Sequence, residues 1–360
     1  MGATRRRLLL AFASAAVGAG GDARAAATLG IHPRALRFPD DFGSHPDTRT
    51  EWWYITGTLS AGDRLHGFQI TFFRSRTAVS ETQPSRFAAR QLLFAHAALT
   101  DLQEGRLRHD QRIARAGFGV AEAQERDTAL VLRDWTLRRD TGRYRARAAS
   151  EAAGFAFDLE LVSTQPVLLQ GEAGYSRKGP RPDQASHYYS EPQLAVSGTL
   201  TKAGKSTPVK GRAWLDHEWS DTLLDPQAVG WDWIGMNLDD GAALTAFRLR
   251  RADGSALWAG GSFRPAGAAV RNFDPGEIVL TPGRVWSSPS SRARYPVEWT
   301  VLTPAGRFGV KALLDDQELD SRASTGSIYW EGLSDLLDEQ GRRVGRGYLE
   351  MTGYAGALKM

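Results

Sequence analysis

Two aromatic segments of this chain can be aligned with each other without a gap, and this internal similarity is the strongest constraint on its fold. An offset of 179 positions places Trp52 on Trp231 and Tyr54 on Trp233. The same offset pairs Ile55 with Ile234, Leu59 with Leu238, Gly62 with Gly241, Leu65 with Leu244, Phe68 with Phe247 and Ile70 with Leu249. A second offset, of 134, aligns 211–216 with 345–350. The sequence therefore predicts a tandem of two related units.

The local patterns predict that both units are built from β-strands. Residues 51–59 are rich in aromatic and β-branched side chains, 61–63 form a turn, and 65–73 form a second strand. Residues 155–161 alternate strictly between apolar and polar side chains. Further strands are expected at 129–135, 244–251, 257–258 and 295–301, with a helical turn at 333–339. For 91–103 we favour two short strands, with a helix as the alternative that its composition allows. The expected fold class is all-β.

Closure of each unit into an up-and-down barrel would pair its last strand with its first. The strand at 211–219 should then lie beside the strand at 51–59, and the link at 220–230 should lead directly into the second barrel. We therefore predict an extended arm at 26–47, a first domain at 48–221 and a second at 222–360. The junction between the domains is the expected place for a ligand site, because such sites concentrate at domain interfaces and barrel mouths.

The first 25 residues read as a secretory signal. A charged segment containing Arg5, Arg6 and Arg7 precedes an apolar run at 8–19 and an A-x-A cleavage pattern at 23–25. Both a twin-arginine signal and an ordinary Sec signal fit this pattern. We expect a periplasmic or secreted protein.

Composition excludes several classes of function. These 25 residues carry +3 of the net charge of +4, so the remainder has no basic stripe for nucleic acid. The absence of cysteine excludes disulfides, thiolate metal sites and cysteine nucleophiles. Neither the G-x-S-x-G pattern of serine hydrolases nor a phosphate-binding G-x-x-x-x-G-K-[ST] loop occurs.

Aromatic and titratable residues crowd together at 211–219 and 230–234. Along the first strand, His217 and Trp219 should share one face, and Trp214, Asp216 and Glu218 the other. Asp232 should oppose Trp231 and Trp233 in the same way. Large rings beside acids are typical of a ligand site, since rings form apolar walls and burial shifts the protonation of acids.

Motifs along nearly the whole chain resemble the bacterial AttH-like and carotenoid 1,2-hydratase-like family. They are FPDDFGSHP at 38–46, RTEWWYITG at 49–57, FQITFFR at 68–74, FAHAALTD at 94–101, HYYS at 187–190, WLDHEWS at 214–220, GSIYWEG at 326–332 and YLEMTGY at 348–354. The resemblance implies two tandem lipocalin-like antiparallel β-barrels. It also implies either hydration of a carotenoid double bond or a secreted protein encoded with transporter components. Related fungal proteins catalyse cyclisations in the same kind of pocket.

The expected ligand is therefore a hydrophobic small molecule of isoprenoid, carotenoid or lipid type, and any chemistry is that of a hydro-lyase or an isomerase or cyclase without a cofactor. Acid-catalysed hydration needs a protonated acid, a group that activates water and rings that stabilise a cation. Carried over by motif, the resemblance points to His217 and Trp219, with Asp232 as a weaker match. We assign Asp232 as proton donor, His217 as the group that activates water and Glu218 as a third catalytic candidate. The ligand-binding candidates are Trp53, Trp214, Asp216, Trp219, Trp231 and Trp233.

The repeat supports this choice, because His217, Glu218 and Asp232 have no acidic or basic counterpart in the other unit. A structural role is the alternative, with Asp216 or Glu218 paired to Arg49 or Arg212. No metal site is expected, since His45, His96, His187 and His217 show no close ligand spacing.

Three interpretations of function remain open. An enzyme should bring His217 and Asp232 into a pocket. A carrier should tie these groups up in ion pairs beside an open apolar cavity, and a non-catalytic accessory protein of an ABC-type transporter should have an exposed aromatic patch and no sizeable cavity. Peripheral contact with a membrane fits all three.

Overall fold

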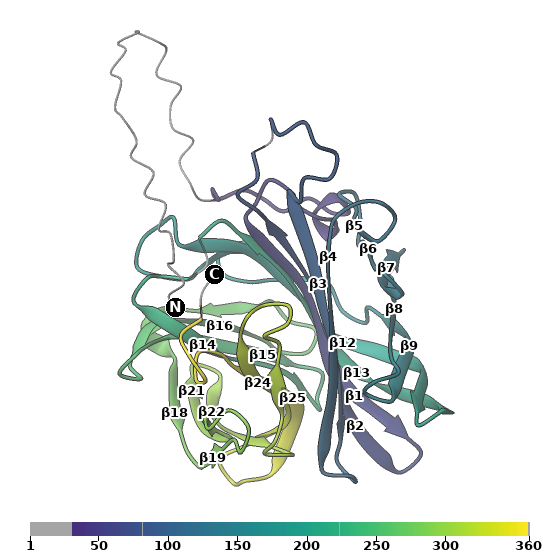
Figure 1. Ribbon diagram of the computed structural model, residues 1–360. Coiled ribbons are helices and arrows are strands. Elements are labelled where there is room, and N and C mark those ends of the chain that lie inside the picture. The colour runs from purple at the N-terminus through teal and green to yellow at the C-terminus, as the bar shows by residue number, and fades with distance from the viewer. Residues whose placement is uncertain (1–30, 81, 223, 359–360) are drawn as a thin grey trace, which may run out of the picture.

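The computed structural model describes residues 31–80, 82–222 and 224–358, so the predicted signal segment lies outside the described residues. The chain folds into two large antiparallel sheets, one from each half, and each sheet curls around its own apolar core (Figure 1). The fold is all-β with two lipocalin-like units, as the sequence predicts. Within the described ranges, no helix is long and apolar enough to span a membrane.

The first sheet has 13 strands in the order β4-β3-β2-β1-β13-β12-β9-β8-β7-β6-β5, with β10 and β11 paired to β12. Its strands are β1 Thr50–Ala61, β2 Arg64–Arg76, β3 Gln91–Asp101, β4 Arg106–Arg115, β5 Ala121–Ala123, β6 Ala129–Leu132, β7 Trp135–Asp140, β8 Arg143–Ser150, β9 Phe155–Val162, β10 Leu168–Leu169, β11 Tyr175–Arg177, β12 Ala185–Lys202 and β13 Lys205–Ser220. The 3-10 helix η1, Asp40–Phe42, lies in the arm that precedes β1.

The second sheet has ten strands, with the path β17-β16-β15-β14-β25-β24-β22-β21-β18 and β23 paired to β24. Its strands are β14 Ala228–Leu238, β15 Ala243–Arg251, β16 Ala256–Arg264, β17 Arg271–Phe273, β18 Val279–Pro282, β21 Glu298–Thr303, β22 Gly306–Ala312, β23 Glu318–Asp320, β24 Ile328–Leu337 and β25 Arg343–Met351. A two-stranded ribbon, β19 Val285–Ser287 with β20 Arg294–Pro296, and the 3-10 helix η2, Pro275–Glu277, complete this half.

The predicted pairing of last strand with first is confirmed in both halves. Tyr54 of β1 lies opposite Asp216 of β13, and Trp233 of β14 lies opposite Glu350 of β25. These pairs are related by both offsets of the sequence repeat, so the ladder that joins first and last strand is itself duplicated. The hairpins differ, because Leu65 pairs with Ser60 whereas its aligned counterpart Leu244 pairs with Met236. The pairing of the first strand with the last is therefore the same in both units. The pairing within the first hairpin differs between the units by three residues.

Four local predictions were wrong. Residues 91–101 form the single strand β3, and 333–337 continue the strand β24 instead of forming a helical turn. The predicted strand at 129–135 is broken between β6 and β7 by a turn in which Arg133 has a φ of 57°. The predicted strand at 295–301 is divided into β20 and β21. Alternation along a strand does not show where a tight turn interrupts it.

Candidate functional site

The two barrels pack against each other through the outer faces of the strands that close them. Alternate residues of β1 and β13 point into the first barrel, and the residues between them point toward the second barrel. Strands β14 and β25 divide their side chains in the same way. Both faces of these strands are therefore buried.

A cleft of about 790 Å³ lies along this junction. Its aromatic lining comes from both units and comprises Trp52, Tyr54, Phe73, Phe94, Tyr188, Trp231, Trp233, Phe247 and Tyr329. The volume and the apolar walls are those of a site for a small organic molecule. Six carboxyl groups also line it: Asp216, Glu218, Glu331 and Glu350 come from strands of the junction, and Asp221 and Asp225 from the link between β13 and β14.

Asp216 is held by three donors. Ser190 Oγ and Trp214 Nε1 donate to its Oδ1 at 2.5 and 2.6 Å, and the Tyr188 hydroxyl donates to Oδ2 at 2.8 Å. Burial raises the pKa of Asp216 to about 7 against the effect of these donors, and the charge of Glu218 adds to the rise. Asp216 is therefore poised to exchange a proton near neutral pH.

Glu331 and Glu350 lie on adjacent strands, directly opposite each other. Burial and the charge of Glu350 raise the pKa of Glu331 well above its ordinary value. Burial likewise raises the pKa of Glu350 to about 7. Among the ion pairs of the described residues, none involves Asp216, Glu331 or Glu350, so proton retention is the means by which these acids avoid buried charge.

The two oxygens of Glu331 have different surroundings. Gln69 Nε2 donates to Oε2 at 2.7 Å, whereas Oε1 is buried with no donor as close among the described residues. The Tyr54 hydroxyl is buried in the same way. Burial, followed by the charge of Glu331, raises the pKa of Tyr54. A hydrogen bond between Tyr54 and Glu331 also influences the pKa of both groups, so the two side chains lie within reach of each other in the lining of the cleft.

Glu218 differs from the other three acids of the junction strands because a cation neutralises it. Lys178 Nζ lies 3.0 Å from its Oε1, and Ser186 Oγ donates to the same oxygen. The Lys178 ammonium also lies 4.3 Å from the centre of the Phe247 ring and 4.6 Å from that of Tyr188. The sequence suggested Arg49 or Arg212 as the partner of Glu218, and the structure pairs it with Lys178.

His217 and Trp219 point away from the cleft, into the first barrel, as their predicted shared face requires. His217 stacks on Trp53 with ring centres 4.4 Å apart, and its Nε2 and Nδ1 lie 2.9 Å from Glu51 Oε1 and 3.0 Å from the Tyr189 hydroxyl. Burial lowers the pKa of His217 to about 4. The neutral ring therefore donates to Glu51 from Nε2 and accepts from Tyr189 at Nδ1.

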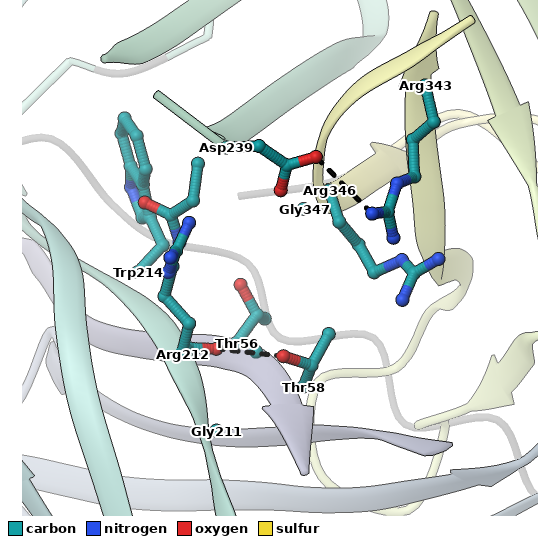
Figure 2. A pocket seen from close by; sticks show the side chains of 11 residues that line it. Thr56, Thr58, Gly211, Arg212, Trp214, Asp239, Arg343, Arg346 and Gly347 are labelled. Atoms are coloured by element: carbon teal, nitrogen blue, oxygen red, sulfur yellow. Dashed lines mark hydrogen bonds and ion pairs between the residues drawn. The ribbon is translucent and has the colours of Figure 1, made fainter. Parts of the chain in front are cut away.

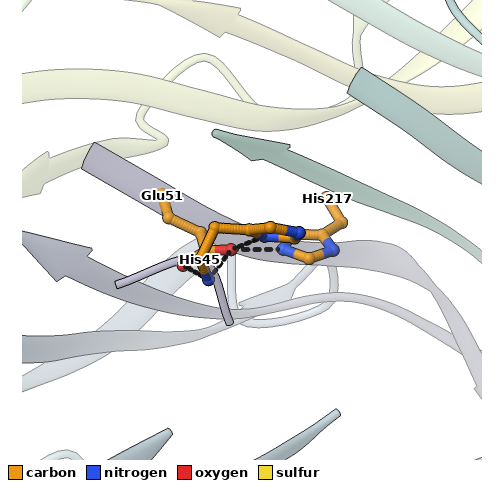
Figure 3. Close-up of side chains that lie close together, drawn as sticks. All are labelled: His45, Glu51 and His217. Atoms are coloured by element: carbon orange, nitrogen blue, oxygen red, sulfur yellow. Dashed lines mark hydrogen bonds and ion pairs between the residues drawn. The ribbon is translucent and has the colours of Figure 1, made fainter. Parts of the chain in front are cut away.

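The fold also brings together a group of possible metal ligands that the sequence spacing did not indicate. Atoms of His45, Glu51 and His217 lie within 4.8 Å of one another (Figure 3). His45 Nδ1 lies 2.7 Å from Glu51 Oε1 and its Nε2 lies 2.9 Å from Asp41 Oδ1, so both ring nitrogens must donate. These two acceptors outweigh burial and raise the pKa of His45.

Positive charge already neutralises Glu51. The guanidinium of Arg74, which is 2% exposed, donates from Nε to Glu51 Oε2 at 2.7 Å. With the His45 imidazolium on Oε1, each Glu51 oxygen has a cationic donor. We interpret the group as an ion-pair network that fastens the arm to the first barrel, because a metal ion would have to displace the His45 proton beside a fixed guanidinium.

Asp232 lies inside the second barrel. Arg248 Nε is 2.7 Å from its Oδ2 and Arg250 Nε is 3.6 Å away, while the Tyr354 hydroxyl donates to Oδ1 at 2.8 Å. Neither Asp232 nor His217 lines the cleft, and the structure places them in the interiors of different barrels. The structure therefore does not bring these two catalytic candidates together.

A second pocket, of about 280 Å³, lies farther along the same seam (Figure 2). Its polar lining includes Arg212, Arg343 and Arg346, with Asp239 ion-paired to Arg343 at 3.4 Å. Trp214 lines this pocket and donates its indole N–H to Asp216 of the main cleft. The pocket is smaller and more polar in its lining residues than the cleft, which makes the cleft the stronger candidate site.

The structure places the predicted site residues in three groups. Trp214, Asp216, Glu218, Trp231 and Trp233 face the junction, Trp53, His217 and Trp219 face the first barrel, and Asp232 faces the second. Sequence reasoning missed Glu331 and Glu350 as site residues. The offset of 134 aligns Asp216 with Glu350, and this duplicated acid is the sequence signal that could have identified Glu350.

The comparisons with known proteins agree with this fold. A family model described as AttH-like matches residues 30–354. The crystal structure of a protein assigned to AttH from Nitrosomonas europaea superimposes with a TM-score of 0.84 and 48% identity, covering 91% of this chain and 99% of that one. No match was found among curated proteins.

Two more distant structures share the fold. Kievitone hydratase from Nectria haematococca gives a TM-score of 0.67 at 15% identity, with 91% of this chain and 96% of that one covered. CghA gives 0.52 at 11% identity, with 85% and 88% covered. At these identities the likeness establishes the architecture of two lipocalin-like units.

Proposed function

We propose that this chain, which belongs to the AttH-like family, binds a hydrophobic small molecule in the cleft between its barrels and adds water across a carbon–carbon double bond of that molecule. One observation carries the proposal. The acids Asp216, Glu331 and Glu350 line an aromatic cleft, have raised pKa values and have no ion-pair partner among the described residues.

The geometry supplies each requirement of acid-catalysed hydration. A protonated Glu331 donates its proton to one carbon of the alkene, and the positive charge develops on the other carbon. The faces of Trp231 and Trp233 stabilise that cation. Water then adds to the cation and gives one proton to the ionised Asp216. Proton exchange with solvent restores Glu331 and Asp216 to their starting states, so the net reaction consumes one water.

The directions of the pKa shifts are consistent with Glu331 as the acid and Asp216 as the base. Burial raises the pKa of Glu331 well above its ordinary value, which favours the protonated form that an acid needs. Asp216 accepts hydrogen bonds from three donors, which favour the ionised form that a base needs. General acids and bases work best when their pKa values lie near the working pH. Kievitone hydratase, whose name assigns water addition to a protein of this fold, is consistent with the proposal.

A carrier without turnover is the second candidate, and specific contacts favour it. Asp232, Glu218 and His217 are all engaged by partners, as a carrier requires of those three. The two candidates differ at Glu331, which a carrier does not need as an acid. Export to the periplasm and association with a transporter are further parts of the proposal that rest on the sequence.

Ligand binding is tested with Trp231→Ala. Trp231 is only partly buried, so its loss should leave the fold intact while removing one wall of the cleft. We expect the affinity for an acyclic carotenoid, followed by fluorescence quenching, to fall about tenfold or more. Leu302→Ala, at an exposed position of the second barrel, is the control and should bind like the wild type. Equal affinity for all three proteins would contradict binding in the cleft.

Turnover should depend on pH with a defined sign. The pKa of Asp216 and that of Glu350 are raised to about 7, so these acids are protonated below that pH and ionised above it. The mechanism needs an ionised Asp216 as base and a protonated Glu331 as acid. We expect the hydration rate in D2O, measured by the mass gain of the product, to rise by roughly tenfold or more from pH 5 to pH 7 as Asp216 ionises. A rate that does not rise across this range would contradict the role of Asp216 as the base.

A further inference from the structure

An exposed apolar surface lies beside the cleft, on a rim formed by the β2–β3 loop and the β4–β5 turn. Phe87 is 64% exposed and Phe118 is 49% exposed, and their rings stack with centres 5.4 Å apart and planes 7° from parallel. Ile113 and Val120 are each 38% exposed. Half of the large hydrophobic side chains recorded as exposed in the described chain therefore belong to these two neighbouring segments. We name this set, Phe87, Ile113, Phe118 and Val120, the aromatic rim.

Cations surround the aromatic rim. The Arg115 guanidinium lies 4.4 Å from the centre of the Phe118 ring and 5.2 Å from that of Phe87, and Arg86 lies 5.7 Å from Phe118. Residues 82–90 and 112–120 contain four arginines and no acid. Arg112 is paired with Asp110 at 2.7 Å, and Arg90 donates to the carbonyl oxygen of Gln83. The acids that flank these segments in the sequence are Glu81, Asp110 and Glu122. The rim is thus apolar at its centre and positively charged around it.

The rim adjoins the mouth of the cleft. Ile113 lines the cleft and lies on the same face of β4 as Arg115, two residues on. Leu92, which also lines the cleft, pairs with Arg115 across β3 and β4. Figure 1 shows the β2–β3 loop projecting at the upper end of the molecule, near β5. A molecule leaving a surface docked on the rim would therefore meet the cleft directly.

We propose that the aromatic rim docks onto the surface of an anionic lipid bilayer. The two phenylalanine rings enter the boundary between headgroups and acyl chains, and the surrounding guanidinium groups contact lipid phosphates. Apolar side chains at the centre with arginines at the periphery match a bilayer, which is apolar below a negatively charged layer. Transfer of an apolar ligand from the bilayer past the rim into the cleft would follow from this docking, and that step rests on the proposed function. The docking itself does not rest on it.

Flotation with lipid vesicles tests the docking on the full protein without any ligand. We expect the wild type to float with phosphatidylglycerol-containing vesicles at low salt, and to bind phosphatidylcholine vesicles roughly tenfold more weakly. The double variant Phe87→Ser/Phe118→Ser should lose about tenfold or more in binding to both. Arg86→Gln/Arg115→Gln should lose the preference for the anionic lipid and the sensitivity to salt.

The matched control is Val279→Ser/Leu302→Ser, which removes two side chains of 49% and 48% exposure from the second barrel. It should float like the wild type, and thermal unfolding should show that all variants are folded. Docking on a bilayer is overturned if the wild type stays in the aqueous phase or if the control variant loses as much binding. It is also overturned if the phenylalanine substitutions change only the oligomeric state, which would make the rim a contact between proteins. None of these outcomes bears on Trp231→Ala and ligand binding, so the two proposals fail separately.

Discussion

Replacement of Glu51 by Gln is expected to lower the free energy of unfolding by about 3–5 kcal/mol, as is typical when one partner of a buried ion pair is removed. The carboxylate is fully buried, and both Arg74 and His45 depend on it. The variant leaves the Arg74 guanidinium buried with hydrogen bonds to carbonyl oxygens but without a counter-charge. Urea-induced unfolding, followed by tryptophan fluorescence, measures the loss.

Two controls separate this network from an ordinary ion pair and from a metal site. Glu160→Gln removes the partner of Arg143 on the surface, where both side chains are about half exposed, and should cost no more than about 1 kcal/mol. A chelator should leave the unfolding of the wild type unchanged. If the chelator destabilises the wild type as much as Glu51→Gln does, then His45, Glu51 and His217 hold a metal ion instead of a proton.

The contribution of the network should vary with pH. Hydrogen bonds from His217 and His45 overcome burial and hold the pKa of Glu51 well below 4.5, so its stabilisation is present above that value and is lost in acid. The pKa of His45 is raised above 6.5, so its stabilisation is complete below 6.5 and is lost as the pH rises through the folded-state value. The difference between wild type and Glu51→Gln should therefore be largest between pH 4.5 and 6.5.

The sequence predicted the architecture because the fold depends on patterns that are local and repeated. Alternation along a strand identifies the residues that share a face, and the two offsets identify the strands that close each barrel. Both predictions hold at Tyr54 and Asp216 and at Trp233 and Glu350. The family motifs added the lipocalin-like form of the two units.

The site was harder to predict because alternation along a strand does not show whether a given face points into a barrel or into the cleft between the barrels. His217 and Asp216 are adjacent in the chain, yet one lies in a barrel and the other in the cleft. Selecting residues that are not duplicated led to His217 and Asp232, which lie in separate interiors. A junction between related units draws on duplicated positions instead, and it brings Asp216 and Glu350 to the same cleft.

Replacement of Glu331 by Gln is expected to have opposite effects on turnover and stability. Loss of the proposed acid should lower the hydration rate by about 10²–10⁴, the usual contribution of general acid catalysis. The amide keeps the shape of the side chain and can still accept the hydrogen bond from Gln69. Binding of an acyclic carotenoid should therefore survive within a few fold, which distinguishes a lost acid from a distorted cleft.

The stability effect follows from the direction of the pKa shift. Burial and the charge of Glu350 raise the pKa of Glu331 in the folded state well above 4.5, so the folded protein retains a proton that the unfolded chain releases. The wild type thus loses stability as the pH rises above 4.5, at about 1.4 kcal/mol per pH unit until the folded group ionises. Glutamine does not titrate, so the variant should become progressively more stable than the wild type as the pH rises above 4.5.

Asp232→Asn provides the reciprocal experiment. The sequence-based hypothesis makes Asp232 the proton donor, and it requires this substitution to abolish hydration while binding survives. In the structure Asp232 neutralises Arg248 and Arg250 inside the second barrel, so its loss should destabilise the fold by about 3–5 kcal/mol. If Asp232→Asn stops turnover in folded protein while Glu331→Gln leaves it intact, the chemistry belongs to the second barrel. If Glu331→Gln alone stops turnover, Glu331 is the acid of the reaction. If the same variant is also more stable than the wild type at pH 8, the native Glu331 lowers the stability of the fold while it supplies the proton that the reaction needs.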